Sequence, residues 1–315
     1  MLREPTIREV RCAARRIKPH IHHTPVLTSR AVNEMYDAEI FFKCENFQRA
    51  GAFKMRGATN AVFSLDDEEA GRGVTTHSSG NFAAALALAA GSRGIDAHVV
   101  MPRTAPQIKK DAVAGYGAEI TYCEPTLDAR EAGVEEVIER TGATFVHPYN
   151  DYRIIAGQGT AALELLGKIP DLEIVIAPVG GGGLLSGTAI AVFGISPMTR
   201  VVGAEPEMAD DAFRSLKEGK ILPSVNPQTI SDGLLTSLGD LTFPIIQKLV
   251  EEIVTVSEEE TISAMRCIYE RMKIVVEPSA AVSLGALMRN RSRLQKMRIG
   301  IILSGGNVDL TKLPF

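Results

Sequence analysis

The sequence predicts an α/β fold in which helices cover both faces of a largely parallel sheet. Short runs rich in Val and Ile alternate along the chain with stretches of helical periodicity, which is the pattern of βαβ units. Several of these runs are apolar on both faces, as expected for strands buried between two layers of helices. The 315 residues contain no internal repeat and no long linker, so they are long enough for one large domain or two modest ones.

Two helices are predicted from the capping of their first turns. Thr6 and Glu9 have the spacing of a capping box and are accompanied, at helical period, by Ile7, Val10, Ala14 and Ile17. Ser257 and Glu260 repeat this pattern ahead of Ile262, Met265, Ile268 and Met272. Six strands are predicted as well, over residues 97–101, 119–122, 144–147, 174–179, 201–205 and 299–303.

The turns that follow Val179, Glu205 and Leu303 carry unusual chemistry, and ligands of open α/β sheets bind at the carboxyl ends of strands. The turn after Val179 is Gly180-Gly181-Gly182-Gly183, with a helical stretch behind it. Successive glycine N–H groups and a helix N-terminus suit a phosphate monoester. An isolated glycine run is usually a flexible turn, but the position between strand and helix favours phosphate binding.

A lysine in apolar surroundings is the second candidate. Lys54 lies between Phe53 and Met55, in a segment bounded by Gly51 and Gly57. Desolvation there would lower the pKa of the amine and make it a nucleophile toward an aldehyde. Taken alone, a single lysine is usually a solvated surface charge.

Two polar loops complete the set of candidates. The segment His77-Ser78-Ser79-Gly80-Asn81 opens an Ala-rich helical stretch, so its N–H groups and hydroxyls would either cap the helix or hold a carboxylate. The segment Ser304-Gly305-Gly306-Asn307 follows the last predicted strand. Ser304 would serve there either as an ordinary turn residue or as a hydrogen-bond partner for a heterocycle nitrogen.

Bulk properties exclude several classes of protein. The net charge of −4 gives no hint of nucleic-acid binding, and no apolar stretch approaches the roughly 20 residues needed to cross a bilayer. The four cysteines lack the close pairs of a zinc site or a redox dithiol. They are expected to be reduced thiols of a cytoplasmic protein: Cys12, Cys44, Cys123 and Cys267.

In this order, the motifs resemble the serine racemase and serine/threonine dehydratase family, which are fold-type II pyridoxal-phosphate enzymes of the tryptophan synthase β type. The resemblance runs nearly end to end, through His23-Thr24-Pro25, Glu45-Asn46-Phe47-Gln48, the lysine segment, residues 156–160, 276–279 and 304–310. It implies two domains, each with a mostly parallel sheet flanked by helices. Residues 1–70 and 151–315 would form a large cofactor domain, and residues 71–150 a small mobile domain that closes over substrate. A homodimer is the family expectation.

The resemblance also implies a role for each candidate. Lys54 would hold pyridoxal 5'-phosphate as a Schiff base, with Phe53 packed on the ring. The ring hydroxyl would contact Asn81 and the pyridine nitrogen Ser304, while the phosphate would bind to Gly180, Gly181, Gly182 and Gly183. The substrate carboxylate would rest on Ser78, Ser79, Gly80 and Asn81, with Arg130 as a closing contact from the smaller domain.

The chemistry follows from these roles. The cofactor acidifies the substrate Cα proton, which Lys54 can remove as a general base. Loss of a β-hydroxyl then gives an enamine that hydrolyses to a 2-oxo acid and ammonia. Racemase-like members carry Ser at the position of Ser79, on the face opposite the lysine, whereas dedicated threonine dehydratases carry Ala. Because 3-hydroxyaspartate dehydratases also carry Ser, this residue leaves the activity open.

Two further features depend on the resemblance. Glu205, Asp211 and the backbone carbonyl of Ala209 match a divalent-cation site of racemase-like members, and such oxygen ligands suit Mg²⁺ or Ca²⁺. Without the resemblance, this segment would be interpreted as a solvated acidic loop.

Phe82 stands where the family usually has His, which bears on substrate preference and on the balance between racemisation and elimination.

The resemblance therefore predicts a serine racemase with serine/threonine dehydratase activity on a small hydroxy-amino acid. The closest alternative is a dehydratase of 3-hydroxyaspartate or threonine that racemises little. A non-catalytic cofactor-binding protein is an alternative of another class, but the intact set of Lys54, Ser79 and Ser304 argues against it. The resemblance also leaves room for a nucleotide effector.

Overall fold

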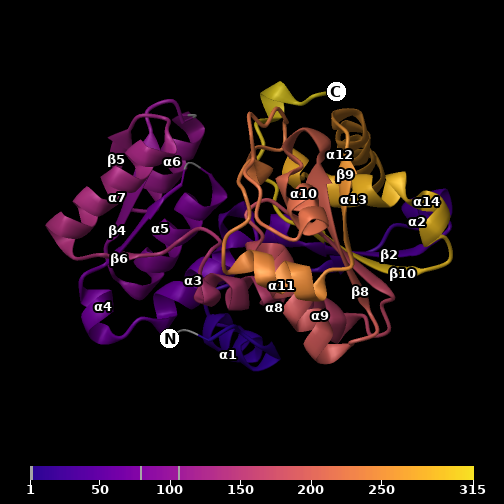
Figure 1. Ribbon diagram of the computed structural model, residues 1–315, viewed down its shortest axis with the longest axis horizontal. Coiled ribbons are helices and arrows are strands. Elements are labelled where there is room, and N and C mark those ends of the chain that lie inside the picture. Colours follow the sequence, from indigo (N-terminus) through magenta and orange to yellow (C-terminus); the bar gives the residue numbers. More distant parts are fainter. Residues whose placement is uncertain (1–2, 79, 106) are drawn as a thin grey trace.

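Two separate sheets, each with its own helices, lie side by side in this protein (Figure 1). The computed structural model describes residues 3–78, 80–105 and 107–315. We term the two parts the six-stranded unit and the four-stranded unit. The N-terminal residues, residues 151–315 and the helix that carries Lys54 belong to the first, and β3 to β6 with their helices to the second.

The larger sheet has the strand order β1-β2-β10-β7-β8-β9, and every pairing is parallel except that of β1 with β2. Ile301 in the middle of β10 pairs with Phe42 on one side and Ile176 on the other. The strands are β1 (Val26–Leu27), β2 (Glu39–Cys44), β7 (Ile174–Pro178), β8 (Arg200–Pro206), β9 (Glu252–Val256) and β10 (Arg298–Leu303).

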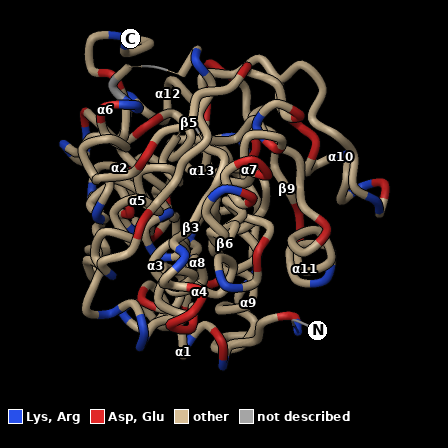
Figure 2. The backbone as a smooth tube through the Cα atoms, turned by 90° about the vertical axis from the view of Figure 1, so that its left-hand side faces the viewer, with Lys and Arg blue, Asp and Glu red and all other residues tan. Residues whose placement is uncertain are grey.

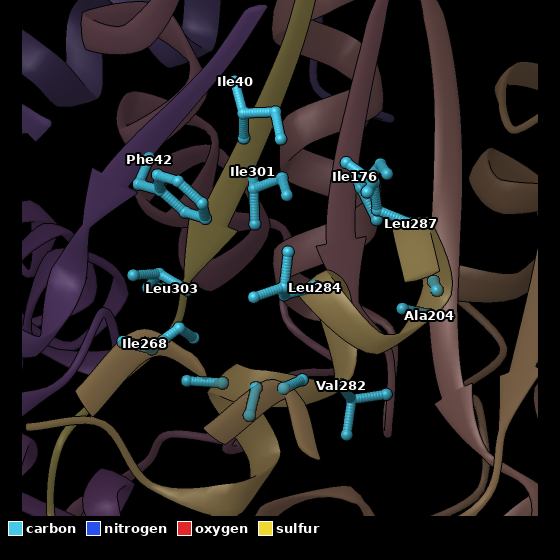
Figure 3. Packing of buried hydrophobic residues seen from close by; sticks show 14 of the residues in the cluster. Ile40, Phe42, Ile176, Ala204, Ile268, Val282, Leu284, Leu287, Ile301 and Leu303 are labelled. Carbon is cyan, nitrogen blue, oxygen red and sulfur yellow. The ribbon is translucent and has the colours of Figure 1, made fainter. Parts of the chain in front are cut away.

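Helices cover both faces of this sheet because consecutive strand residues point to opposite sides. Ile301 belongs to the core cluster beneath α2 (Arg30–Tyr36), α12 (Glu258–Met272) and α13 (Pro278–Arg289). Figure 3 shows Leu284 and Leu287 of α13 in that cluster, packed near Ile301 and Ile176. Ile302 belongs to the opposite cluster, whose helices are α1 (Ile7–Ile17), α8 (Tyr152–Lys168), α9 (Gly183–Ile195) and α11 (Thr242–Leu249).

The smaller sheet is wholly parallel, with the order β5-β4-β3-β6. Its strands are β3 (Val74–His77), β4 (Ala97–Pro102), β5 (Glu119–Cys123) and β6 (Thr144–Phe145). Its helices are α4 (Asp67–Gly71), α5 (Asn81–Arg93), α6 (Gln107–Gly115) and α7 (Leu127–Thr141). Figure 2 looks onto this unit and shows basic and acidic residues interspersed around it.

Helix α3 (Lys54–Ser64) lies between the two units (Figure 1). Its residues Met55 and Val62 share a core cluster with Phe82 and Leu86 of α5. The same helix also contacts α8 of the six-stranded unit, where Gly57 and Gly157 approach so closely that a Cβ on Gly157 would lie 2.6 Å from the Gly57 Cα. The lysine helix is therefore packed against both units.

The predicted elements are present. Both capping boxes form as expected, Thr6 with Glu9 at α1 and Ser257 with Glu260 at α12. All six predicted strands occur, whereas β1, β2, β3 and β9 were not predicted. The remaining short elements are α10 (Asp211–Glu218), α14 (Arg291–Leu294), η1 (Glu45–Phe47), η2 (Arg49–Gly51), η3 (Glu207–Ala209), η4 (Asp232–Leu234) and η5 (Leu310–Lys312). None of the described helices is both long and apolar enough to cross a membrane.

Candidate active site

Lys54 opens α3, and the loop after β10 fixes the backbone just before it. The Phe53 N–H donates to the Ser304 carbonyl over 2.9 Å. Gly51 has a φ of +71°, and a Cβ at this position would lie 2.2 Å from Asn307 Oδ1. The positive φ favours glycine, because other residues rarely adopt it, and a side chain at this position would also displace the Asn307 amide. The structure therefore brings the predicted lysine and serine segments together.

The Lys54 side chain is half-buried, and its amine lies near two aromatic rings and a backbone carbonyl. Its Nζ donates to the carbonyl of Pro148 over 3.0 Å and lies 5.1 Å from the Phe53 ring centroid and 5.7 Å from that of Phe82. Burial lowers the pKa of Lys54 to about 8, although the nearby Glu277 carboxyl opposes this shift. The amine is consequently neutral for a larger fraction of the time than an exposed lysine, which makes it a better nucleophile and base.

Glu277 is a site residue to which the sequence analysis gave no role. It is 4% exposed, and both of its carboxylate oxygens accept from Asn81 Nδ2 at 3.0 Å. Burial raises the pKa of Glu277 to about 7. The Asn81 Oδ1 accepts in turn from Asn307 Nδ2 at 2.9 Å, so Asn81 is held by two side chains of the six-stranded unit. The available signal was an acid directly before Pro278, in an otherwise apolar helix start.

The four glycines form the predicted turn between β7 and α9. Gly182 has a φ of +88°, and a Cβ on Gly181 would lie 2.4 Å from the ring of Tyr149. Within the described residues, no hydrogen bond uses the N–H groups of the four glycines as donors. These donors are therefore free for an anion at a helix N-terminus. Tyr149, which lines this turn, was missed because a lone tyrosine in a loop carries no distinctive pattern.

The polar loop before α5 lies at the carboxyl end of β3. The Ser78 N–H donates to the Val100 carbonyl at 3.2 Å, and the Gly80 N–H approaches Ser78 Oγ at 3.4 Å. Asn81 is the first residue of α5. Ser79, the predicted second proton-transfer residue, lies outside the described residues.

Arg130 and two histidines lie around the same end of the small sheet. Burial lowers the pKa of His77, and the Arg130 guanidinium lowers it further. The Arg130 Nε is buried and has no hydrogen-bond partner in the part of the chain that the structure describes. Burial also lowers the pKa of His147, to about 4, and the charges of His77 and Lys54 add to this effect. Both imidazoles are thus neutral near neutral pH.

The predicted cation ligands lie in and after β8. Glu205 is fully buried, and its two oxygens accept the N–H groups of Ala212 and Phe213 at 2.8 Å. Asp211 is also buried, and neither of its carboxylate oxygens has a hydrogen-bond partner among the described residues. Burial raises the pKa of Glu205 to about 9 and that of Asp211 to about 6. Ala209, the predicted carbonyl ligand, ends the turn η3 between them.

A family model described as "Pyridoxal-phosphate dependent enzyme" matches residues 17–305. The chain belongs to this family. It is 53% identical to the beta-hydroxyaspartate dehydratase of Paracoccus denitrificans (strain Pd 1222) over 99% of both chains. It is 51% identical to the serine racemase of Arabidopsis thaliana, over 95% of this chain and 92% of the other. The solved structure of maize serine racemase superposes with a TM-score of 0.95 at 45% identity, over 98% of this chain and 95% of that one.

The residues of this pyridoxal-phosphate enzyme fit its cofactor. The glycine turn offers free N–H donors that suit the phosphate, and Lys54 offers a buried amine of lowered pKa that suits the aldehyde. The carbonyl of Pro148 accepts from Lys54 while the ring of the next residue, Tyr149, lies against Gly181. The segment 148–149 therefore joins the two ends of the cofactor site. The chain has the architecture of a fold-type II enzyme, with two mostly parallel sheets flanked by helices.

Proposed function

We propose that the protein is a serine racemase that also dehydrates serine and threonine. The observation that carries the proposal is the Lys54 amine, which is buried, has a pKa lowered to about 8 and is held beside Phe53 and the Ser304 loop. Bound pyridoxal phosphate would supply an electron sink that acidifies the substrate Cα proton. Backbone and side-chain groups of this chain would perform the remaining steps of binding and proton transfer.

Lys54 would take the Cα proton, since its apolar surroundings favour the neutral amine that a general base requires. The Ser78 hydroxyl and the N-terminus of α5 would orient the substrate carboxylate. Asn81 would hold the ring hydroxyl of the cofactor, because Glu277 and Asn307 already fix its amide. Ser79 would return or remove a proton on the opposite face, which inversion at Cα requires.

Incubation with L-serine, with D-serine and pyruvate assayed in parallel, tests this proposal. We expect both products from the wild type and neither from Lys54→Ala. Ser79→Ala should lose D-serine while retaining measurable pyruvate. Formation of pyruvate without D-serine by the wild type would reject the racemase half of the proposal.

A second candidate substrate is 3-hydroxyaspartate, as the name of the relative from Paracoccus denitrificans suggests. The specific observation in its favour is Arg130, whose buried Nε has no partner among the described residues and would suit a second carboxylate. Arg130→Gln should then lower kcat/KM for 3-hydroxyaspartate by roughly tenfold or more and affect L-serine less. Equal losses for the two substrates would count against this candidate.

We also propose that Mg²⁺ or Ca²⁺ binds to Glu205, Asp211 and the carbonyl of Ala209. The two buried carboxylates support this, because Asp211 lacks any hydrogen-bond donor in the described chain and burial of such a group is costly. Added cation should raise the unfolding temperature and a chelator should reverse the rise. Asp211→Asn should abolish the effect, whereas Asp210→Asn, whose carboxylate pairs with Arg214 instead, should retain it.

A further inference from the structure

An ion pair joins the two units at a point distant in sequence from α3. Lys109 on α6 donates to the carboxylate of Asp232 on η4. In Figure 1, α6 lies near the top of the four-stranded unit, whereas α3 lies lower, between the units. The units are therefore held by packing at α3, by the hydrogen bonds of Asn81 with Glu277 and Asn307, and by opposite charges at α6.

The Asp232 side of this pair is anchored to the cofactor site. The N–H of the next residue, Gly233, donates to Ser279 Oγ on α13 at 3.1 Å. Leu234 is buried in the core, and its Cα lies 3.0 Å from where a Cβ on Gly180 would be. The segment η4 thus lies directly against the first glycine of the phosphate turn.

The Lys109 side is connected to the substrate loop. Val113, one turn further along α6, packs in one cluster with Ala83 and Ala84 in the first turn of α5. That turn begins immediately after the loop Ser78–Gly80, whose predicted role is to hold the substrate carboxylate. A restraint on Lys109 therefore limits how far the first turn of α5 can move from the six-stranded unit.

Both charges also act on the interior of the site. The charge of Asp232 raises the pKa of Glu277 and the charge of Lys109 lowers it, both after the larger effect of burial. The electrostatic effect of the pair therefore reaches the carboxyl that holds Asn81.

We propose that Lys109 and Asp232 are positioning residues, whose ion pair holds the first turn of α5, with Asn81, at its working distance from Lys54. The inference rests on the proposed function, since it assigns Asn81 to the ring hydroxyl of the cofactor. The two side chains are 27% and 54% exposed, and ion pairs of this kind are weak. A weak pair suits the role, because it can open to admit substrate and reform behind it.

Lys109→Gln, Asp232→Asn and the charge-exchanged double variant K109D/D232K test the proposal in the cofactor-loaded enzyme. Lys110→Gln is the matched control, because Lys110 lies on the same helix but donates to the Arg103 carbonyl at 2.7 Å, within its own unit. KM and kcat for L-serine would be measured at low and high ionic strength. Hydrogen exchange over α5 and α6 would report the position of this turn without substrate turnover.

Each single variant should raise KM roughly two- to fivefold with little change in kcat, the size expected for a partly exposed ion pair. Exchange over α5 and α6 should become faster, and the double variant should restore both quantities. Salt should raise KM of the wild type toward that of the variants.

Unchanged KM and exchange in the single variants, equal effects in Lys110→Gln, or failure of the double variant to restore them would overturn the proposal. Absence of turnover with every hydroxy-amino acid would reject the proposed function, while the exchange measurements would still decide the role of the pair.

Discussion

At the scale of single residues, burial gives Lys54 a reactivity that exposed lysines lack. Its pKa is lowered to about 8, so we expect the cofactor-free protein to take up pyridoxal phosphate faster as pH rises through about 8. The rate would be followed by the visible absorption of the bound cofactor, with Lys54→Arg as the unreactive control. A midpoint near the ordinary lysine pKa of about 10.4 would show that burial does not govern this amine.

A single methyl group added at Gly181 should weaken the binding of pyridoxal phosphate. A Cβ there would lie 2.4 Å from the Tyr149 ring, so Gly181→Ala must displace the ring or distort the phosphate turn. Such overpacking costs about 1–3 kcal/mol, and we expect the dissociation constant of pyridoxal phosphate to rise by roughly tenfold. A fluorescence or absorption titration would measure it.

Two further variants separate overpacking from a general loss of glycine. Gly167→Ala, at a helical position with no atom within 4 Å of the added Cβ, should bind cofactor normally and stabilise the fold by about 0.5–1 kcal/mol. Tyr149→Ala should recover cofactor binding in the Gly181→Ala background. If cofactor binding does not recover, the clash with the Tyr149 ring is not what weakens it in Gly181→Ala.

At the scale of secondary-structure elements, a buried charge network fixes the lysine helix. Arg56 on α3 is fully buried, donates to Glu45 through Nε at 2.7 Å and Nη2 at 2.8 Å, and donates to Glu164 of α8 through both Nη atoms at 2.8 Å. Lys43 of β2 donates to the same Glu164 at 2.6 Å. The network thus links α3, two residues beyond Lys54, to the sheet and to α8.

Removal of Arg56 should be severely destabilising. Arg56→Met leaves the fully buried Glu45 without its ion-pair partner and removes one of the two cations that contact Glu164, which costs about 3–5 kcal/mol. Burial alone would raise the pKa of Glu164, but Arg56 and Lys43 together lower it below its ordinary value of 4.5. An acid with a lowered pKa stabilises the fold above its unfolded pKa and loses that contribution as pH falls through the folded pKa. The free energy of unfolding that Arg56→Met loses, measured with urea, should therefore be large near neutral pH and shrink as pH falls below the ordinary glutamate pKa of 4.5.

Buried polar and charged residues explain why part of the fold escaped prediction. Strand β2 contains the buried Lys43, and a charge inside a six-residue strand hides its apolar pattern. Strand β3 contains Thr75 and Thr76, which are polar but fully buried. The capped helices α1 and α12 were predictable because their signals are local, as were the glycine turn and the Lys54 segment. Glu277, Tyr149 and the pair Lys109–Asp232 were not, because their roles arise from contacts between distant segments.

At the scale of the whole molecule, the segment after β6 returns the chain from the four-stranded to the six-stranded unit. His147 organises this return, since its Nδ1 accepts the N–H groups of Tyr149 at 3.3 Å and Asn150 at 2.9 Å. The Asn150 side chain then bonds to Asp240 at 2.6 Å and to the Leu241 N–H at 2.9 Å, both in the six-stranded unit. The connection between the units thus depends on an imidazole that accepts hydrogen bonds.

Acid should weaken this connection before it unfolds the rest. A protonated imidazole cannot accept at Nδ1, and burial lowers the pKa of His147 from its ordinary 6.5 to about 4. Because the unfolded chain binds this proton at higher pH than the folded one, stability is full above about 6.5 and falls as pH drops toward 4. His147→Asn keeps an acceptor for the N–H groups two and three residues ahead but cannot titrate. Between about pH 7 and about pH 5, the free energy of unfolding measured with urea should fall less for this variant than for the wild type. The control is His23→Asn, a substitution at a side chain that is 75% exposed. Equal losses in all three proteins would place the acid sensitivity elsewhere in the molecule.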